Sequence, residues 1–174
     1  RLGRDDCYVR QFRGAFPGDG GRIDPANVAR ALAAFERTLV SFGSAFDRGT
    51  LSPDEGKGRA VFARDCAACH AGPLFTDRAY HRLDPLDPAA PDQGLFEATG
   101  RAEDRARFRT PSLRNVLLTG PWWHDGGAGT IEEALRRHRR PITPADMAAL
   151  VAFLGALSDP AFTTRADLAM PDKA

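Results

Sequence analysis

The pentapeptide Cys66-Ala67-Ala68-Cys69-His70 constrains this chain more than any other feature of its sequence. Its two thiols are separated by about one helical turn, and an imidazole follows the second thiol directly. This C-x-x-C-H spacing is the attachment signature of haem c, in which both thiols add to the vinyl groups and the histidine coordinates the iron. We therefore expect one covalently bound haem, with short helices packed around it.

Two other uses of paired cysteines need different surroundings. A redox dithiol needs no following histidine, and a structural zinc site needs about two further Cys or His ligands close by. His81 is the nearest candidate for such a ligand. The third cysteine, Cys7, makes the count odd, which is a poor basis for a disulfide framework in one chain. Haem attachment is the favoured interpretation.

Length and composition place the chain among ordinary globular proteins. Its 174 residues correspond to about one domain, and 43% apolar with 27% charged residues exclude a disordered chain. The net charge of +1 offers no global field for nucleic acid or for an anionic membrane. The longest apolar run, Met147 to Leu157, is too short to span a bilayer. We expect neither a nucleic-acid partner nor a membrane span.

The first residues, Arg1 to Asp6, contain neither an initiator methionine nor an apolar secretion segment. This start predicts a chain that is cut or truncated upstream, where a targeting signal or a further domain would lie. Haem c attachment takes place outside the cytoplasm, so we expect a periplasmic protein.

The N-terminal part of the chain predicts an arm and one amphipathic helix. Asp24 is a good N-cap, and Pro25 suits the first helical position. Apolar residues then recur at helical spacing as far as Ser41, namely Val28, Ala31, Leu32, Phe35 and Leu39. We treat 1–174 as a single domain, in which 1–50 form the arm and helix and 51–174 form the haem-binding core.

The core is predicted to be all-α with long connections. Two capping boxes, each a hydroxyl residue followed three positions later by Glu, open helices over 52–64 and 130–138. Between 71 and 107 the periodicity disappears, which predicts a long loop around the haem, and a short turn follows over 111–116. A last helix begins at Thr143, with the predicted stripe Met147, Leu150, Val151, Leu154 and Leu157.

Four residues are candidates for the second axial ligand of the haem. Met147 is expected in the core instead, and Met170 lies in a terminal tail. His124 stands in a glycine-rich turn, where a structural hydrogen bond is expected. His138 shares the apolar face of its helix with the residues three and seven positions earlier, so we predict that it is the ligand. The alternative is a core histidine bonded to backbone.

Four segments in order resemble the C-terminal half of the bacterial di-haem cytochrome c peroxidase and MauG family: ALAAFERTLVSFGSAFDRG, CAACHAGPLFTD, FRTPSLRNVLLTGPWWHDG and TIEEAL. The similarity covers about residues 10–157. It implies two class I c-type cytochrome domains, each with one haem and with calcium between them. This chain resembles the domain of the electron-transfer haem. The domain of the peroxide-reacting haem carries its own C-x-x-C-H and is expected outside this chain, upstream or as a separate polypeptide.

The resemblance assigns roles to individual residues. Cys66, Cys69 and His70 match the haem attachment site. The backbone carbonyls of Thr119 and Pro121 match calcium ligands, and such oxygens suit a hard cation.

Two further pairs of residues are carried over with alternatives. Arg109 and Arg114 match arginines near the haem, where pairing with propionates is expected and surface or interdomain ion pairs are the alternative. Trp122 and Trp123 stand where Tyr-Phe or Tyr-Met is common, which makes them candidates for an electron relay. Packing against the haem edge is the alternative role of these indoles.

The position of the sixth ligand departs from the family pattern. Peroxidase members carry Met there and MauG-type members carry Tyr, whereas His138 aligns with it here. A bis-histidine haem is expected at lower potential than a His/Met haem, which favours a MauG-like role. In that role peroxide oxidises the haem pair and a protein substrate supplies the electrons; an ordinary peroxidase draws them from cytochrome c. The alternative function is a stand-alone mono-haem electron carrier.

Overall fold

The computed structural model describes residues 2–83, 87 and 89–168. These residues separate into two compact units, which meet between Val40 and Ser41. The first unit is therefore shorter than the arm and helix expected over 1–50. Among the described residues, no helix combines the length and apolar character that crossing a bilayer requires.

The first unit consists of short helices: η1 (Leu2–Arg4), α1 (Asp6–Ala15), η2 (Pro17–Asp19) and α2 (Pro25–Glu36). Asp24 caps α2 as predicted, because its carboxylate accepts a hydrogen bond from the backbone N–H of Asn27 at 2.9 Å. The helix ends at Glu36, before the predicted end at Ser41. A tighter turn replaces its last part, in which the Thr38 hydroxyl donates to the Phe35 carbonyl at 2.7 Å.

Much of the predicted apolar stripe is exposed, although its spacing predicts a buried face: Val28 and Ala31 are half-buried, and Leu39 lies beyond the end of α2. The exposed fractions of Leu32, Phe35 and Leu39 are 58%, 49% and 41%. Only Phe12 and Asn27 are buried among the described residues of this unit. The unit is too small to offer a second apolar layer against which the stripe can pack.

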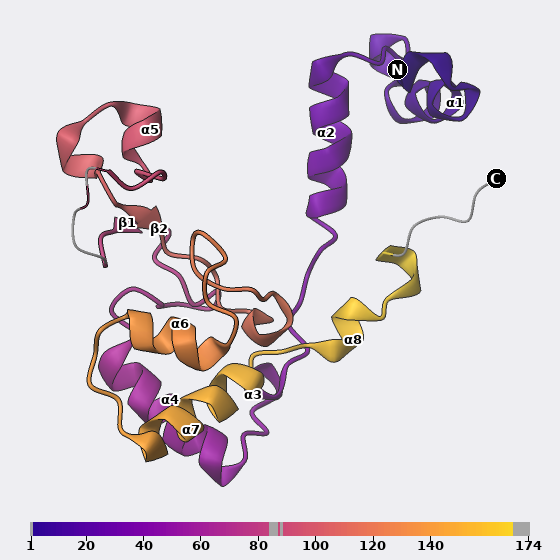
Figure 1. The fold of residues 1–174 in the computed structure, drawn as a ribbon. Coiled ribbons are helices and arrows are strands. Elements are labelled where there is room, and N and C mark those ends of the chain that lie inside the picture. Colours follow the sequence, from indigo (N-terminus) through magenta and orange to yellow (C-terminus); the bar gives the residue numbers. More distant parts are fainter. Residues whose placement is uncertain (1, 84–86, 88, 169–174) are drawn as a thin grey trace. The chain divides into compact units, whose positions relative to one another are not determined.

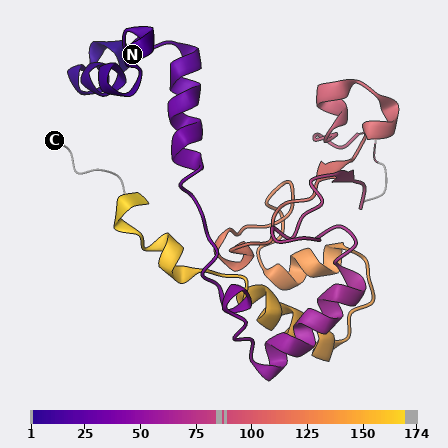
Figure 2. The same cartoon turned by 180° about the vertical axis from the view of Figure 1, so that it is seen from behind.

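The second unit contains most of the helical structure (Figures 1 and 2). Its helices are α3 (Ala45–Arg48), α4 (Pro53–Asp65), α5 (Phe96–Thr99), α6 (Ile131–Arg137), α7 (Pro144–Gly155) and α8 (Pro160–Thr163). Short 3-10 helices are η3 (Ala102–Asp104), η4 (Val116–Leu118) and η5 (Ala166–Leu168). Two-residue strands β1 (Tyr80–His81) and β2 (Phe108–Arg109) pair antiparallel, with Tyr80 opposite Arg109. The fold is thus the predicted all-α class with one small ladder.

The helices of the second unit begin where their caps predict. Ser52 and Thr130 both form complete capping boxes, each with the Glu three residues later. The turn expected over 111–116 instead begins at Val116, as η4. His138 follows the last residue of α6 as its C-cap.

The core of the second unit lies where α4 crosses α7, which run side by side in both views (Figures 1 and 2). Gly58 is buried at the crossing, and a Cβ atom there would lie 1.9 Å from the Ala149 carbonyl oxygen. This close approach brings the rings of Phe62 and Phe153 to 5.1 Å between centroids. Leu150 of α7 is fully buried beside them. The packed pair of helices is the platform on which the site is built.

Candidate haem-binding site

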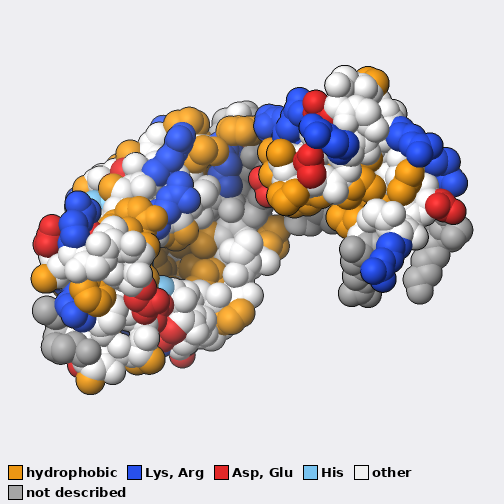
Figure 3. Space-filling model, turned by 90° about the horizontal axis from the view of Figure 1, so that it is seen from above, with side chains coloured by type: hydrophobic (Ala, Val, Ile, Leu, Met, Phe, Trp, Pro, Cys, Tyr) orange, Lys and Arg blue, Asp and Glu red, His pale blue; other side chains and the backbone are white. Residues whose placement is uncertain are grey.

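A cavity of about 510 Å³ lies beside the α4–α7 pair. It is lined by apolar side chains of these helices and of α6, and by the segment from β2 to His124. The space-filling view shows a hollow in the second unit with hydrophobic side chains on its floor and a histidine at its edge (Figure 3). The predicted site residues that line the cavity are Cys66, Cys69, His70, Arg109, Thr119, Pro121, Trp122, Trp123 and His138. Such a volume suits a cofactor with a large apolar body.

His70 enters the cavity from the end of α4. The chain continues through a turn after Cys66, whose carbonyl accepts the His70 backbone N–H at 3.0 Å. The Nδ1 atom of His70 lies 3.1 Å from the Phe75 carbonyl oxygen, which can only accept, so Nδ1 carries the proton. Burial lowers the pKa of His70 and keeps the ring neutral. The Nε2 lone pair is thereby left available as a ligand.

His138 enters the cavity from the end of α6. Its Nδ1 atom lies 2.9 Å from the carbonyl oxygen of Ala134, one turn earlier in the same helix. The same argument therefore places the proton on Nδ1 and leaves Nε2 as the acceptor atom. The Trp123 indole packs edge-on against the His138 ring at 5.3 Å between centroids.

The separation of the two imidazoles tests whether a metal ion fits between them. The centroids of the His70 and His138 rings lie 6.4 Å apart. Two imidazole nitrogens at about 2.0 Å from one metal ion place the ring centres about 6.3 Å apart, because each centre lies roughly 1.15 Å behind its nitrogen. The observed spacing therefore matches one iron held by both rings, and the donor set fits haem c.

The two cysteines lie at the same wall, half-buried and without a disulfide. Burial raises the pKa of the Cys66 thiol, and the Asp65 carboxylate adds to this effect. A redox dithiol instead depends on a lowered thiol pKa. The electrostatics of Cys66 therefore give no support to the dithiol interpretation.

Within the described residues, the zinc alternative brings together three possible ligands. A thiol, a carboxylate and an imidazole, from Cys69, Asp77 and His81, have ligand atoms within 4.8 Å of one another. A structural zinc site usually takes four ligands, mostly Cys and His, and Cys66 is not in this group. His81 Nε2 lies 2.7 Å from the Asp77 carboxylate, whose pKa is about 2 because the Ala79 N–H and then His81 donate to it. We interpret the pair as a hydrogen-bonded dyad at the cavity wall.

The two predicted arginines have different surroundings. Arg109 lines the cavity, and its guanidinium forms no hydrogen bond or ion pair with another described residue. Arg114 lies behind the cavity wall and differs from the expectation that it pairs with a propionate. Both of its terminal nitrogens bind the Asp47 carboxylate at 2.8 Å, and its Nε donates to the Pro73 carbonyl. A buried guanidinium prefers this fixed bidentate partner, which lies far away in the sequence.

The two indoles of the cavity also differ. Trp122 is tied to the backbone, since its Nε1 donates to the Val116 carbonyl at 2.8 Å and its main chain pairs with Ala128. Trp123 instead contacts the ring of His138. Nearby, the carbonyl oxygens of Thr119 and Pro121 accept no hydrogen bond from the described residues.

The other candidates for the second axial ligand have different roles. Met147 is half-buried but lines an outer groove instead of this cavity, and Met170 lies outside the described residues. His124 stacks on Phe108 at 3.7 Å and binds the Asp92 carboxylate, as a structural histidine would. The backbone hydrogen bond of His138, predicted as the alternative to ligation, is present, with the Ala134 carbonyl four residues earlier. The bond of His70 to the Phe75 carbonyl was not predicted.

Comparison with known families agrees with this geometry. The sequence model of the family described as "Di-haem cytochrome c peroxidase" matches residues 1–55. That of the family described as "Cytochrome c" matches residues 56–158. The chain belongs to the di-haem cytochrome c peroxidase and MauG family. The boundary between the two matches falls just after the start of α4.

Relatives in this family include both enzyme types. Cytochrome c551 peroxidase of Nitrosomonas europaea is 34% identical, over 87% of this chain and 49% of that protein. MauG of Methylorubrum extorquens is 38% identical, over 74% of this chain and 38% of that protein. The chain thus spans about half the length, or less, of these curated relatives.

Solved structures show the same fold. A MauG-like protein associated with microbial copper homeostasis superimposes with a TM-score of 0.84 at 27% identity, over 99% of this chain and 64% of that chain. The di-haem peroxidase BthA of Burkholderia thailandensis gives a TM-score of 0.68 at 25% identity, over 88% and 56% of the two chains.

Proposed function

We propose that the second unit binds one haem c, attached through Cys66 and Cys69, with His70 and His138 as axial ligands. The observation that carries the proposal is the pair of imidazoles that line one cavity with their ring centroids 6.4 Å apart, each with its Nδ1 bound to a carbonyl. A haem held in this way would supply one-electron redox chemistry.

The surrounding residues prepare the cavity for this group. Phe62, Leu150 and Leu154 make one wall apolar and exclude water from it. Arg109, which has no partner among the described residues, is the candidate to pair with a propionate. Of the two candidate relay residues, Trp123 is better placed than Trp122, because it contacts the ring of His138.

The function that these features support is electron transfer within a di-haem peroxidase. In this proposal the chain is the electron-transfer haem domain, and a second haem domain reacts with hydrogen peroxide. The exposed apolar residues Leu32 and Phe35 of α2, with Leu39 just after the helix, support a second domain, because an apolar face of this kind is normally covered. It belongs to the segment that matches the di-haem peroxidase model.

The electron donor is either a cytochrome c or, as in the MauG type, a protein substrate. An imidazole in place of a thioether lowers the haem potential, which favours the protein substrate. We place the reaction in the periplasm, where haem c is attached. The carbonyls of Thr119 and Pro121, which accept no hydrogen bond from the described residues, are candidate calcium ligands at the boundary with the second haem domain.

The ligand set is tested on the haem-loaded chain. We expect a mass that includes one haem and survives acid–acetone extraction, and a low-spin spectrum without the methionine–iron band at its red end. His138→Met should create that band and raise the reduction potential, whereas the control His124→Gln should leave both unchanged. An unaltered spectrum in His138→Met would contradict ligation by His138.

Peroxidase activity is tested on the whole natural protein, together with its second haem domain. We expect consumption of hydrogen peroxide coupled either to oxidation of reduced cytochrome c or to modification of a protein substrate. A protein that exchanges electrons but does not react with peroxide would favour the stand-alone carrier instead.

A further inference from the structure

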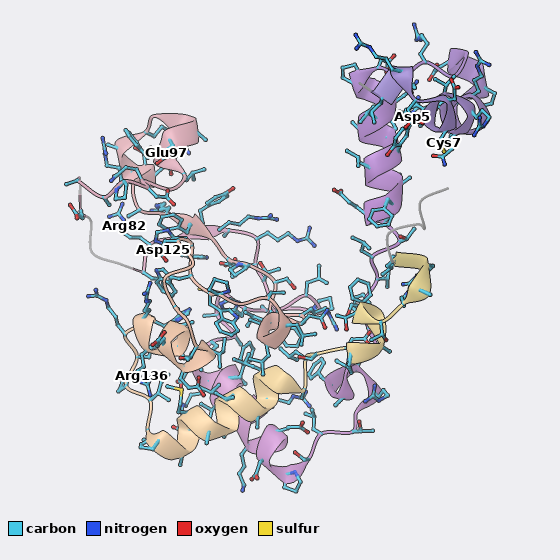
Figure 4. The ribbon with its side chains drawn as sticks, turned by 45° about the vertical axis from the view of Figure 1, so that its right-hand side comes forward. Asp5, Cys7, Arg82, Glu97, Asp125 and Arg136 are labelled. Atoms are coloured by element: carbon cyan, nitrogen blue, oxygen red, sulfur yellow. The ribbon has the colours of Figure 1, made fainter. Side chains whose placement is uncertain are left out.

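A second cavity lies on the outer side of α6 and α7. It is an open groove of about 800 Å³ with apolar side chains of Ile142, Met147 and Val151 in its wall. Arg136, Arg140 and Glu132 supply the charged part of the lining. Figure 4 shows Arg136 projecting outward from α6, above the beginning of α7.

The groove adjoins the candidate haem cavity. Arg140 and Ile142 line both cavities, so one layer of side chains separates the groove from the space next to Cys66. His138 lies between the two arginines in the sequence but turns its ring inward, to the haem cavity. A molecule in the groove would therefore lie close to the axial ligand without entering the cavity.

The two arginines of the groove have no direct partner among the described residues, although Arg140 lies near enough to the Asp65 carboxylate to help Arg64 lower its pKa. Neither Arg136 nor Arg140 forms a hydrogen bond or an ion pair with another described residue. The nearby carboxylates of Asp65 and Asp146 are bound by Arg64, at 2.6 and 3.2 Å. Glu132 is the one carboxylate of the lining, so the groove carries a net positive charge beside an apolar wall.

We propose that this groove docks an electron-transfer protein whose contact surface is acidic around an apolar centre. Protein interfaces commonly combine arginine and methionine anchors with an apolar core, and unpaired arginines accelerate encounter with an acidic partner. The proposal rests on the proposed function, because it assigns to the haem site the face at which its redox partner is seated.

The chain offers a direct reporter of docking. Its two methionines are Met147, in the groove, and Met170, so a sample with ¹³C-labelled methionine methyl groups gives two signals. Met147→Leu assigns them. The probe is a flavodoxin, a small acidic electron-transfer protein, titrated into the haem-loaded full chain in the reduced state at low and at high ionic strength.

We expect the Met147 signal to shift in a saturable way at low ionic strength and to return toward its free position when salt is added. The double variant Arg136→Gln/Arg140→Gln should weaken binding by about tenfold. The matched control Lys57→Gln/Arg59→Gln removes the same charge from α4, away from the groove, and should retain binding within about twofold.

Equal weakening by both double variants would overturn the proposal, because it would show attraction by net charge alone. Absence of a Met147 shift at low ionic strength would also overturn it. This readout is independent of peroxide chemistry: if peroxidase activity fails, the Met147 titration still stands, and if docking fails, the haem spectrum and peroxide turnover are unaffected.

Discussion

The two walls of the candidate haem cavity are held by different kinds of interaction. The wall of His70 rests on the α4–α7 crossing, where Gly58 and Phe62 pack closely against buried residues of α7. The wall of His138 is formed by the short helix α6 and the loop before it, whose buried core residues are Ala128, Ile131 and Ala134 and contain no aromatic ring. Hydrogen bonds such as that from Arg137 to the Gly127 carbonyl add to this smaller packed surface. Side-chain packing thus determines the position of the first wall before any cofactor binds. The second wall depends more on capping and on ligation.

The two walls should therefore respond to different measurements. Changes in the wall of His70 should mainly alter the free energy of unfolding, and changes in the wall of His138 should mainly alter the haem spectrum. Four predictions, each with its own variant or pair of variants, test the comparison in order of decreasing expected effect on stability.

Gly58→Ala should destabilise the chain most, by about 3 kcal/mol, because its Cβ would lie 1.9 Å from a backbone oxygen of α7 and the helices would have to separate. Denaturant unfolding measures the loss. Gly56→Ala on the same helix meets open space, so this control should be neutral or slightly stabilising. Similar unfolding midpoints for both variants would show that the crossing is looser than described.

Asp47→Asn should reduce the pH dependence of the free energy of unfolding, because Asp47 pairs with Arg114 behind the wall of His70. Arg114 and, less strongly, Ser44 lower the pKa of Asp47 from 3.8 to about 2. Because the pKa is lower in the folded state, the ionised carboxylate stabilises the fold by roughly 2 kcal/mol above pH 4. This stabilisation is lost as the pH falls from 4 to 2. The unfolding free energy measured across this range should fall less in the variant. An identical fall in both proteins would contradict the role of the Asp47–Arg114 pair.

Each wall contains one helix that begins with a capping box, so removing the two boxes in turn compares the stability of the walls. Thr130→Ala on α6 and Ser52→Ala on α4 should each cost about 1 kcal/mol. Only the first should also reduce the low-spin fraction in the visible spectrum, because α6 carries His138 at its other end. The comparison between the walls fails if both variants change the spectrum equally.

Trp123→Phe should have the smallest effect on stability, below about 1 kcal/mol, because phenylalanine keeps an aromatic ring beside His138. We expect instead altered g values in the low-temperature EPR spectrum, since the edge-on contact orients the imidazole. Trp122→Phe is the matched control: it loses the hydrogen bond to Val116 and should reduce stability while leaving the g values nearer to those of the parent.

The partners of distant residues could not be predicted from the sequence. Arg114 and Asp47 are separated by 67 positions, so the pairing that removes Arg114 from the cavity appears only after folding. Met147 has the spacing of a core residue, yet the chain leaves it in the wall of an open groove. The stripe of α2 likewise predicts burial, and its exposure shows that amphipathic spacing does not specify the surface that covers a helix.

The sequence by itself determined the attachment motif, the capping boxes of α4 and α6, and the inward face of His138. All of these depend on contacts between residues a few positions apart, for which the local backbone geometry is sufficient. Only the tertiary structure decided that the ring centroids of His70 and His138 lie 6.4 Å apart, and that Arg140 and Ile142 line both the cavity and the groove. Those distances follow from how closely α4 and α7 approach and where the loops cross them, which depends on packing between segments far apart in the chain.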